Sequence, residues 1–467
     1  MKKITTEYTE FSNNYLPFLL LPPCPPWFYI PRQNYQMCYT VRVDNQEKAA
    51  AYHAVALCAV GAEKAVSNEI KKLGLTVVES GFGRVRFRAD TAGLYRSLMG
   101  LRAADRVLLE TAVFPAADFD ALFEGARNVP WERLVPAHMG LKVAKVRSNR
   151  SRLKAETSIQ SIVHKAAADR LCKAYALTRL SDEGTIAEVR VYVEKDTVSL
   201  LLDLSGEPLF KRGYRTEGGA APLRETTAAA MLLLSGWKRK YPLYDPFCGC
   251  GTILTEALMY AWDMAPGLGR RFALNDLLIA DNAIEEAVRA ELRGSVNFER
   301  TIRIAGSDSD ARAVSLATAN IERLRKIHPG ITTTPVELKV LPMQEATSRQ
   351  VTAPVRASLK PDQHAVAQVE SSVYHKKRSC FSKSGGRPSD LGFIVTNPPY
   401  GKRLGDPADS EKLYGEMAAL RRHFPQWKLA VITDHPGFES FFGKKADSCR
   451  EIQGGPIPAC FFQYERL

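Results

Sequence analysis

The sequence contains no closely spaced pair of cysteines of the kind that binds zinc. Its nine cysteines are scattered singly, except for Cys248 and Cys250, and its eight histidines do not fall at ligand spacings beside them. Neither a zinc site nor a disulfide framework is therefore expected. We predict a protein without a metal, in the reducing environment of the cytoplasm.

Long apolar segments are also missing. The stretch from Tyr15 to Leu21 is apolar but short, and prolines follow it at once. It is too short to span a membrane, and it follows a polar run rather than the basic region of a signal peptide. Residues 1–50 have no periodic pattern, and we expect them to form an irregular arm.

Acidic residues are too few to balance the basic ones. The 51 Asp and Glu residues face 64 Lys and Arg residues, which gives a net charge of +13 and a pI of about 9.2. This balance favours a polyanionic partner, and nucleic acid more than an acidic membrane surface. A basic enzyme without such a partner remains the alternative.

The 467 residues are too many for one ordinary core and indicate several domains. A strand, helix, strand, strand, helix pattern over residues 51–108 is typical of a ferredoxin-like α+β unit. A second α+β unit covers residues 109–206, and a linker covers 207–222. From 223 to 467 strands and helices alternate, which predicts a mostly parallel, Rossmann-like α/β sheet. Inside it, residues 348–390 lack periodicity, and we expect disorder there rather than an RNA-contacting loop.

Two basic clusters are candidates for RNA binding. The first lies at a predicted strand-to-helix junction, where arginine side chains and helix N-terminal amides can converge on phosphate. The second lies in the linker, where cations alternate with aromatic rings. The alternative for the first cluster is a solvated charged loop. The candidate residues are Arg147, Arg150, Arg152, Lys154, Lys211, Arg212, Tyr214 and Arg215.

A glycine-rich turn connects the short strand at Leu243-Tyr244 to a predicted helix. It lacks the Lys-Ser/Thr of a phosphate loop and the GxGxxG of a dinucleotide fold. It begins with a carboxylate instead, which suits an amine-bearing ligand such as S-adenosylmethionine, whose carboxylate could meet the positive helix end. The candidate cofactor residues in this turn are Asp245, Pro246, Phe247, Gly249, Gly251 and Thr252.

Asp308 ends the next predicted strand of the same domain, after an inserted helical excursion at about 263–299. A carboxylate in this place of a doubly wound fold accepts hydrogen bonds from ribose hydroxyls. The alternative for Asp308 is a helix N-cap, a role that the nearby Asp310 could take.

A third turn, Asn397-Pro398-Pro399-Tyr400, follows the apolar strand 392–396. The two prolines fix the backbone and leave the neighbouring carbonyls free as acceptors. An amide oxygen, a carbonyl and a flat ring could hold a planar ligand with an exocyclic amine. An ordinary turn after a buried strand remains the alternative.

Together the two turns resemble the cofactor and catalytic motifs of bacterial THUMP-containing methyltransferases. These are class I S-adenosylmethionine enzymes related to RlmL, which methylates guanine N2 in large-subunit ribosomal RNA. Members are often labelled N6-adenine-specific DNA methylases, because those enzymes share Asn-Pro-Pro-Tyr. The resemblance runs from about Tyr52 to the C-terminus and includes Ser205-Gly206, Lys211-Arg212-Gly213-Tyr214-Arg215, Ala221-Pro222-Leu223-Arg224-Glu225-Thr226 and Ala265-Pro266-Gly267.

This resemblance implies a ferredoxin-like domain, a THUMP RNA-binding domain and a Rossmann-like class I methyltransferase domain, in that order. It also implies S-adenosylmethionine as cofactor and RNA as partner, and it adds Met343 to the cofactor site. The sequence departs from the family pattern at Cys250, usually serine, at Pro342, commonly an acid, and at Lys402, frequently glutamate.

The resulting hypothesis is methylation of an exocyclic amine in RNA, with guanine N2 of ribosomal RNA favoured. Asn397 and the Pro398 carbonyl would accept the hydrogens of the amine, Pro399 would fix the turn, and Tyr400 would stack on the extruded base. Three alternatives stay open: adenine-N6 methylation of DNA, guanine-N2 methylation of transfer RNA, and RNA binding without catalysis.

Overall fold

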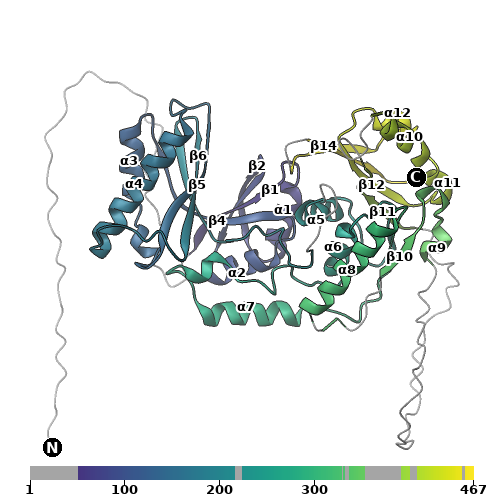
Figure 1. Ribbon diagram of the computed structural model, residues 1–467, viewed down its shortest axis with the longest axis horizontal. Helices are drawn as coiled ribbons and strands as arrows, with labels where there is room; N and C mark the ends of the chain where they lie inside the picture. The colour runs from purple at the N-terminus through teal and green to yellow at the C-terminus, as the bar shows by residue number, and fades with distance from the viewer. Residues whose placement is uncertain are drawn as a thin grey trace, which may run out of the picture. The chain divides into compact units, whose positions relative to one another are not determined.

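The described strands form two seven-stranded sheets, one before and one after residue 215 (Figure 1). The computed structural model describes residues 51–215, 223–328, 330–331, 336–352, 391–399, 407–454 and 458–467. The predicted arm at 1–50, residues 353–390 of the predicted insert, Tyr400 and Lys402 lie outside these ranges. None of the described helices is long and apolar enough to cross a membrane.

The first sheet has the strand order β2-β3-β1-β4-β7-β6-β5. Its first four strands with α1 and α2 make a ferredoxin-like unit, and α3 and α4 lie beside each other against β5 (Figure 1). The elements are β1 (Tyr52–Cys58), α1 (Glu63–Lys72), β2 (Thr76–Gly81), β3 (Arg84–Ala89), α2 (Thr91–Gly100), β4 (Ala104–Pro115), α3 (Phe119–Arg127), η1 (Trp131–Arg133), β5 (Gly140–Asn149), α4 (Glu156–Tyr175), β6 (Ile186–Glu194) and β7 (Thr197–Asp203).

The sequence pattern did not predict strand β4. It pairs with β1 on one side and β7 on the other, so the predicted boundary between residues 108 and 109 falls inside a strand shared by both units. Leu109 faces the main core, while Leu108 packs with Val55 and Leu201 on the opposite face. Because both faces of β4 are covered, its sequence lacks the polar–apolar alternation that marks a half-exposed strand.

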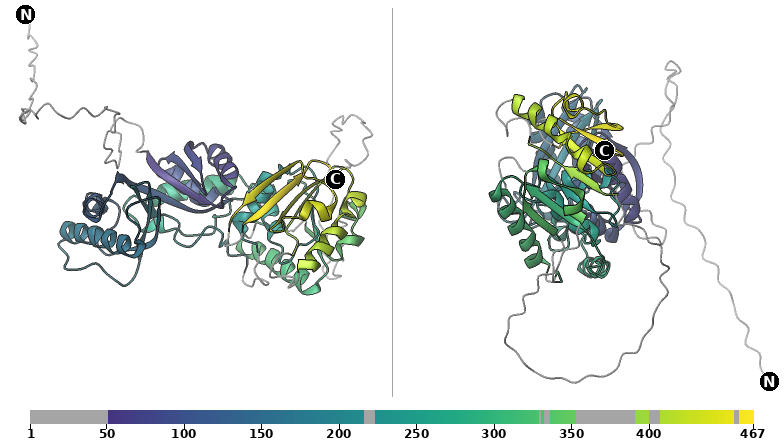
Figure 2. Two further views of the ribbon diagram at one scale, coloured as in Figure 1. Left: turned by 90° about the horizontal axis from the view of Figure 1, so that it is seen from above. Right: turned by 90° about the vertical axis from the view of Figure 1, so that its right-hand side faces the viewer.

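The second sheet has the order β10-β9-β8-β11-β12-β14-β13. Its first five strands are parallel, and β14 and β13 are antiparallel neighbours at one edge (Figure 2). The elements are α5 (Glu225–Leu234), β8 (Leu243–Asp245), α6 (Thr252–Ala261), η2 (Ala273–Asp276), α7 (Asn282–Gly294), β9 (Ile304–Asp308), α8 (Ala311–Ile327), β10 (Val336–Val340), η3 (Met343–Glu345), α9 (Ser348–Thr352), β11 (Phe393–Thr396), α10 (Pro407–Met417), α11 (Leu420–His423), β12 (Lys428–Thr433), α12 (Phe438–Phe442), β13 (Ser448–Ile452) and β14 (Ala459–Tyr464).

Helices cover both faces of this sheet, which confirms the predicted Rossmann-like α/β class. Alternate residues of a strand point to opposite faces, so Leu243 packs with α5, α6 and α8, while Tyr244 packs with α10, α11 and α12. Burial on both sides explains why the central strands β11 and β12 read as nearly continuous apolar runs.

The excursion between α6 and β9 attaches the second sheet to the ferredoxin-like unit. Its helix α7 packs against α2 (Figure 1). The Gly267 amide donates to the Met99 carbonyl at 2.8 Å, and a Cβ at Gly267 would lie 2.7 Å from the Met99 Cα. Only glycine allows this backbone approach, which gives a structural reason for the glycine in Ala265-Pro266-Gly267.

Candidate active site

The three predicted motifs meet at the carboxyl ends of neighbouring parallel strands. Asp308 ends β9, Asp245 ends β8, and Asn397 follows β11, and these strands are adjacent in the order β9-β8-β11. From β8 the chain continues to β9 on one side, while β11 lies on the other side. In open α/β sheets, such a reversal of strand order is where ligands bind.

Asp245 is the buried carboxylate of this site, with 1% of its surface exposed. The Thr396 hydroxyl donates to its Oδ1 at 2.6 Å, and the Phe247 amide donates to the same oxygen at 3.1 Å. Burial raises the pKa of Asp245 to about 7, with a further increase from Asp308. Among the described residues no donor contacts Oδ2, so this oxygen is left for a cationic ligand.

The glycine turn between β8 and α6 adopts a conformation that glycine favours. Gly249 and Gly251 have φ values of +52° and +79°. The Asn320 side-chain amide donates to the Cys250 carbonyl at 2.9 Å and ties the turn to α8. At Gly251 a Cβ would lie 2.9 Å from the Ala317 Cβ. The turn thus brings its backbone close to a ligand at the N-terminus of α6, where the helix dipole favours negative charge.

Asp308 holds this turn in place. Its Oδ2 accepts from the Gly249 amide at 3.0 Å, and its Oδ1 accepts from the Asp310 amide at 3.0 Å. Asp310 caps α8 by accepting from the Arg312 amide, so the N-cap role falls to Asp310 and not to Asp308. A carboxylate oxygen can accept two hydrogen bonds, and both oxygens of Asp308 keep capacity for ribose hydroxyls.

The Asn397 side chain carries an unpartnered polar atom. Its Oδ1 is buried, and no donor among the described residues contacts it. A buried acceptor without a donor is costly, about 1–3 kcal/mol, and such atoms are rare in folded proteins. Pro398 is buried and Pro399 half-buried beside it. The orphaned oxygen is therefore a candidate acceptor for a hydrogen that a ligand supplies.

Comparison with known proteins identifies the family of this chain. Residues 212–354 and 355–460 match the family described as RMKL-like, methyltransferase domain, and residues 53–108 match the RlmL ferredoxin-like domain. The chain belongs to the RMKL-like methyltransferase family.

Three individual proteins illustrate the range of this family. The first, named "Putative RNA methyltransferase YpsC" in Bacillus subtilis (strain 168), is 29% identical over 88% of this chain and 96% of its own. The second, named "Ribosomal RNA large subunit methyltransferase K/L" in Syntrophotalea carbinolica, is 29% identical over 87% of this chain and 52% of its own. This chain therefore spans about half the length of the K/L relative. The third is the crystal structure of SMU.472, described as a putative methyltransferase complexed with SAH. It has 30% identity and a TM-score of 0.73, over 89% of this chain and 98% of its own.

The remaining cofactor candidates of this methyltransferase border the same strand ends. Pro246 is buried and Phe247 half-buried in the turn, and the Thr252 hydroxyl lies 3.4 Å from the Cys250 Sγ. Met343 lies in η3 after β10, buried in the cluster of apolar side chains that also covers Tyr244. The site thus draws on four adjacent strands.

Two residues that contribute to the site were not predicted from the sequence. Thr396 donates to Asp245, and Asn320 supports the glycine turn. Both are buried polar residues within apolar patterns: Thr396 ends an apolar strand, and Asn320 lies on the α8 face that buries Ala317, Ile321 and Leu324. A polar residue at a core position is the signal that could have found them.

The basic cluster between β5 and α4 is exposed. Arg147 forms an ion pair with Glu156, and Arg152 forms one with Asp196. Arg150 and Lys154 have no ion-pair partner among the described residues. Exposed pairs of this kind hold their cations weakly, so the four side chains remain accessible to a polyanion.

Two of the four linker residues that we predicted to bind RNA do not lie on the surface. Arg212 and Tyr214 are buried beside Glu256: the Arg212 Nε lies 3.5 Å from its Oε1, and the Tyr214 hydroxyl donates to that oxygen at 3.0 Å. Arg215 is paired with Glu225 at 2.9 Å. The structure corrects the prediction for Arg212 and Tyr214, because a buried carboxylate draws both side chains inward. Lys211 is exposed and pairs with Glu207.

Proposed function

We propose that this methyltransferase transfers a methyl group from S-adenosylmethionine to an exocyclic amine of a base in RNA. Guanine N2 of large-subunit ribosomal RNA is the favoured target. The observation that carries the proposal is the buried Asn397 Oδ1, which has no donor among the described residues and follows a strand adjacent to β8. An exocyclic amine supplies the hydrogen that this oxygen lacks.

The strand-end residues fit this cofactor. S-adenosylmethionine supplies an electrophilic methyl group when it is bound. Asp245 would hold the ammonium through its Oδ2, and the turn at Gly249 and Gly251 would bind the carboxylate at the N-terminus of α6. Asp308 would accept from the ribose hydroxyls, and Met343 would border the adenine. The SAH in the related crystal structure supports this choice of cofactor.

Positioning is the main catalytic contribution of the protein. The lone pair of an exocyclic amine is delocalised into the ring, which makes the amine a poor nucleophile. Hydrogen bonds from the amine to Asn397 Oδ1 and to the Pro398 carbonyl would orient the lone pair for in-line attack. The Thr396 hydroxyl donates to Asp245, so one hydrogen bond links the segment that carries Asn397 to the carboxylate that would hold the ammonium of the cofactor. No strong general base is needed, because the proton leaves during or after transfer.

RNA as the substrate is supported by charge and by the relatives. The net charge of +13 favours a polyanion, and the exposed cluster at Arg147, Arg150, Arg152 and Lys154 offers cations beside the N-terminus of α4. Both named relatives are RNA methyltransferases by name. We propose that residues 109–206 act as the THUMP domain that holds the RNA.

Asn397→Ala tests the catalytic role. We expect transfer of labelled methyl to RNA to fall at least about a hundredfold, because the amine loses its acceptor, while the dissociation constant for S-adenosylmethionine changes less than about twofold. Asn282→Ala, on the exposed first turn of α7, is the matched control and retains activity. Full activity of the Asn397 variant would overturn the assignment.

The target is identified by the methylated nucleoside. Purified enzyme is incubated with ribosomal RNA, transfer RNA or DNA, and each product is digested and analysed by mass spectrometry. We expect N2-methylguanosine in ribosomal RNA. N2-methylguanosine in transfer RNA instead would identify transfer RNA as the substrate. N6-methyladenine in DNA would favour the DNA alternative. If the protein does not bind S-adenosylmethionine, RNA binding without catalysis is favoured.

A further inference from the structure

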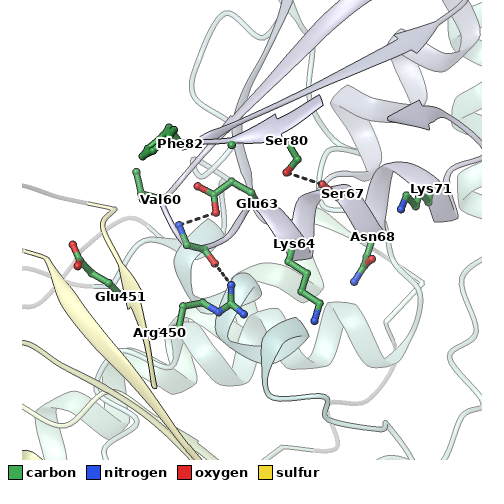
Figure 3. Close-up of a pocket in the computed structure, with 12 residues that line it drawn as sticks. Val60, Glu63, Lys64, Ser67, Asn68, Lys71, Ser80, Phe82, Arg450 and Glu451 are labelled. Atoms are coloured by element: carbon green, nitrogen blue, oxygen red, sulfur yellow. Dashed lines mark hydrogen bonds between the residues drawn. The ribbon is translucent and has the colours of Figure 1, made fainter. Parts of the chain in front are cut away.

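A groove of about 630 Å³ lies between the ferredoxin-like unit and strand β13, and none of its lining residues belongs to the strand-end motifs of the active site (Figure 3). Its walls are joined by the main chain: Val60 and Gln453 exchange two backbone hydrogen bonds, at 3.2 and 3.0 Å. A Cβ at Gly61 would lie 2.0 Å from the Glu451 carbonyl oxygen, so only glycine permits this contact. The groove is therefore a built feature of the fold.

Side-chain bonds fix the inner surface of the groove. Glu63 accepts from the Gly61 amide at 2.9 Å (Figure 3). It also accepts from the Gly83 amide at 2.7 Å, which ties α1 to the hairpin between β2 and β3. The Ser67 hydroxyl bonds to Ser80 across the same wall at 3.2 Å. Both oxygens of the Glu63 carboxylate therefore accept hydrogen bonds from backbone amides.

Phe82 is an exposed aromatic ring at the tip of this hairpin. It is 89% exposed and has a φ of +44°, next to Gly83 at +74°. A side chain in the left-handed region costs about 1–2 kcal/mol, and an exposed ring recovers nothing by burial. The two positive φ values are those of a two-residue type I′ hairpin turn, which projects the ring into solvent at the edge of the groove, where its faces can stack on a planar ligand.

Cations line one side of the same groove. Lys64, Asn68 and Lys71 follow each other at helical spacing on the exposed face of α1 (Figure 3). Neither lysine has an ion-pair partner among the described residues. Arg450 adds a third cation, which donates to the Gly61 carbonyl at 3.5 Å, and the side chain of the one other acid of the lining, Glu451, has no hydrogen-bond partner among the described residues.

We propose that this groove binds an unpaired segment of RNA. A base stacks on Phe82, the backbone phosphates lie against Lys64 and Lys71, and the Asn68 amide bonds to a base edge. An aromatic ring beside cations is the combination that binds single strands, whereas the bases of a duplex are already stacked and cannot reach the ring. The proposal rests on the proposed function in that it takes RNA as the partner.

Binding of a twelve-nucleotide oligouridylate to the full chain tests the groove, with an RNA hairpin duplex as the second probe. Stacking of one base predicts that Phe82→Ala weakens oligouridylate binding about 5- to 100-fold, while Phe82→Tyr retains it. Duplex binding changes less than about twofold in both variants. Equal oligouridylate binding by wild type and Phe82→Ala, or an equal loss for both probes, would overturn the proposal.

The lysines are tested by salt dependence. Lys71→Gln should weaken oligouridylate binding, because one phosphate contact is lost. The slope of the logarithm of the binding constant against the logarithm of the salt concentration should become shallower by the amount that about one contact contributes. Lys72→Gln is the matched control, since Lys72 is exposed on the same helix but does not line the groove. If both substitutions weakened binding equally, the loss would reflect the overall positive charge of the protein. That result would contradict a specific phosphate contact at Lys71.

Methyl transfer separates this proposal from the proposed function. If both hold, Phe82→Ala raises the KM for RNA and leaves kcat unchanged. If wild type binds oligouridylate through Phe82 but transfers no methyl group to RNA, the proposed function fails and the groove stands. If wild type methylates RNA, and Phe82→Ala has the same oligouridylate affinity and the same KM for RNA, the proposed function is supported and the proposal for the groove is wrong.

Discussion

At the scale of single residues, the site depends on one hydrogen bond between distant parts of the chain. Thr396 and Asp245 are 151 residues apart in the chain, and the Thr396 hydroxyl donates to the Asp245 carboxylate at 2.6 Å. This bond lowers the pKa of Asp245, but desolvation by burial outweighs it and raises the pKa to about 7. Asp245 is therefore poised to lose its proton when a cation arrives.

The raised pKa of Asp245 predicts a pH dependence of cofactor binding. Below pH 7 the carboxyl is mostly protonated, so affinity for S-adenosylmethionine should rise as pH increases from 5.5 to 7, by up to about tenfold per unit. The free protein should lose stability over the same window, because a carboxyl with a raised pKa favours folding while it is protonated. Calorimetric titration and thermal denaturation at each pH measure both effects.

Asp245→Asn should remove this pH dependence and weaken the binding of S-adenosylmethionine, since the amide keeps the acceptor for Thr396 but cannot ionise. Asp310→Asn, at the N-cap of α8, is the control and should leave the pH dependence in place. If the pH dependence of S-adenosylmethionine binding were unchanged in the Asp245 variant, another titratable group would be its cause.

At the scale of elements, the glycine turn depends on how closely α8 packs on the start of α6. Gly251 is the N-cap of α6 with a φ of +79°, and a Cβ added to it would lie only 2.9 Å from the Ala317 Cβ. The Asn320 bond to the Cys250 carbonyl holds the two helices at this distance. The shape of the cofactor turn is thus set by packing between helices as well as by its own sequence.

Gly251→Ala should lower the free energy of unfolding by about 1–3 kcal/mol, through left-handed strain and the contact with Ala317. Binding of S-adenosylmethionine should weaken as well, because the turn must shift. Gly294→Ala is the matched control: a Cβ there meets nothing within 4 Å, and this glycine ends α7 without a positive φ. Urea denaturation and calorimetry compare the two variants; equal stabilities would refute the packing argument.

At the scale of the whole molecule, a buried charge cluster joins the ferredoxin-like unit to the methyltransferase sheet. Arg102 donates to the Met264 carbonyl at 2.6 Å, and Arg212 donates to the Arg102 carbonyl at 2.5 Å. Glu69 accepts from the Arg102 amide, and Glu256 lies beside Arg212. All four charged side chains are at most 8% exposed. Buried charges tolerate little displacement, so the cluster fixes how the two parts meet.

Arg102→Met should lower the free energy of unfolding by about 3–5 kcal/mol, because Glu69 and Glu256 lose one of the two buried cations beside them and only Arg212 remains. Arg96→Met removes the exposed pair between Arg96 and Glu291, which also joins α2 to α7, and should cost less than about 1 kcal/mol. Urea denaturation measures both. Similar losses in the two variants would show that burial does not set the strength of this interface.

The sequence predicted the elements whose pattern is local. Helix α8 was predicted with the observed bounds, because its apolar spacing is regular and Asp310 caps it. Helix α5 was not predicted: Glu225–Leu234 is apolar nearly all round, and a helix buried on every side has no polar face to reveal its period. The glycine and proline turns were recognisable because those residues restrict the backbone wherever they occur.

The sequence did not predict which charged side chains pair when they lie far apart in the chain. Arg212 and Tyr214 match a pattern for nucleic-acid binding, yet both are buried against Glu256, while Phe82, which no motif marked, is exposed at a hairpin tip. Whether a cation faces solvent or a carboxylate depends on contacts between residues far apart in the chain. The sequence by itself therefore determined the sheet class and the strand-end motifs, which follow from local periodicity and backbone restriction. Only the tertiary structure decided which cations remain free, because packing across the two sheets sets their burial.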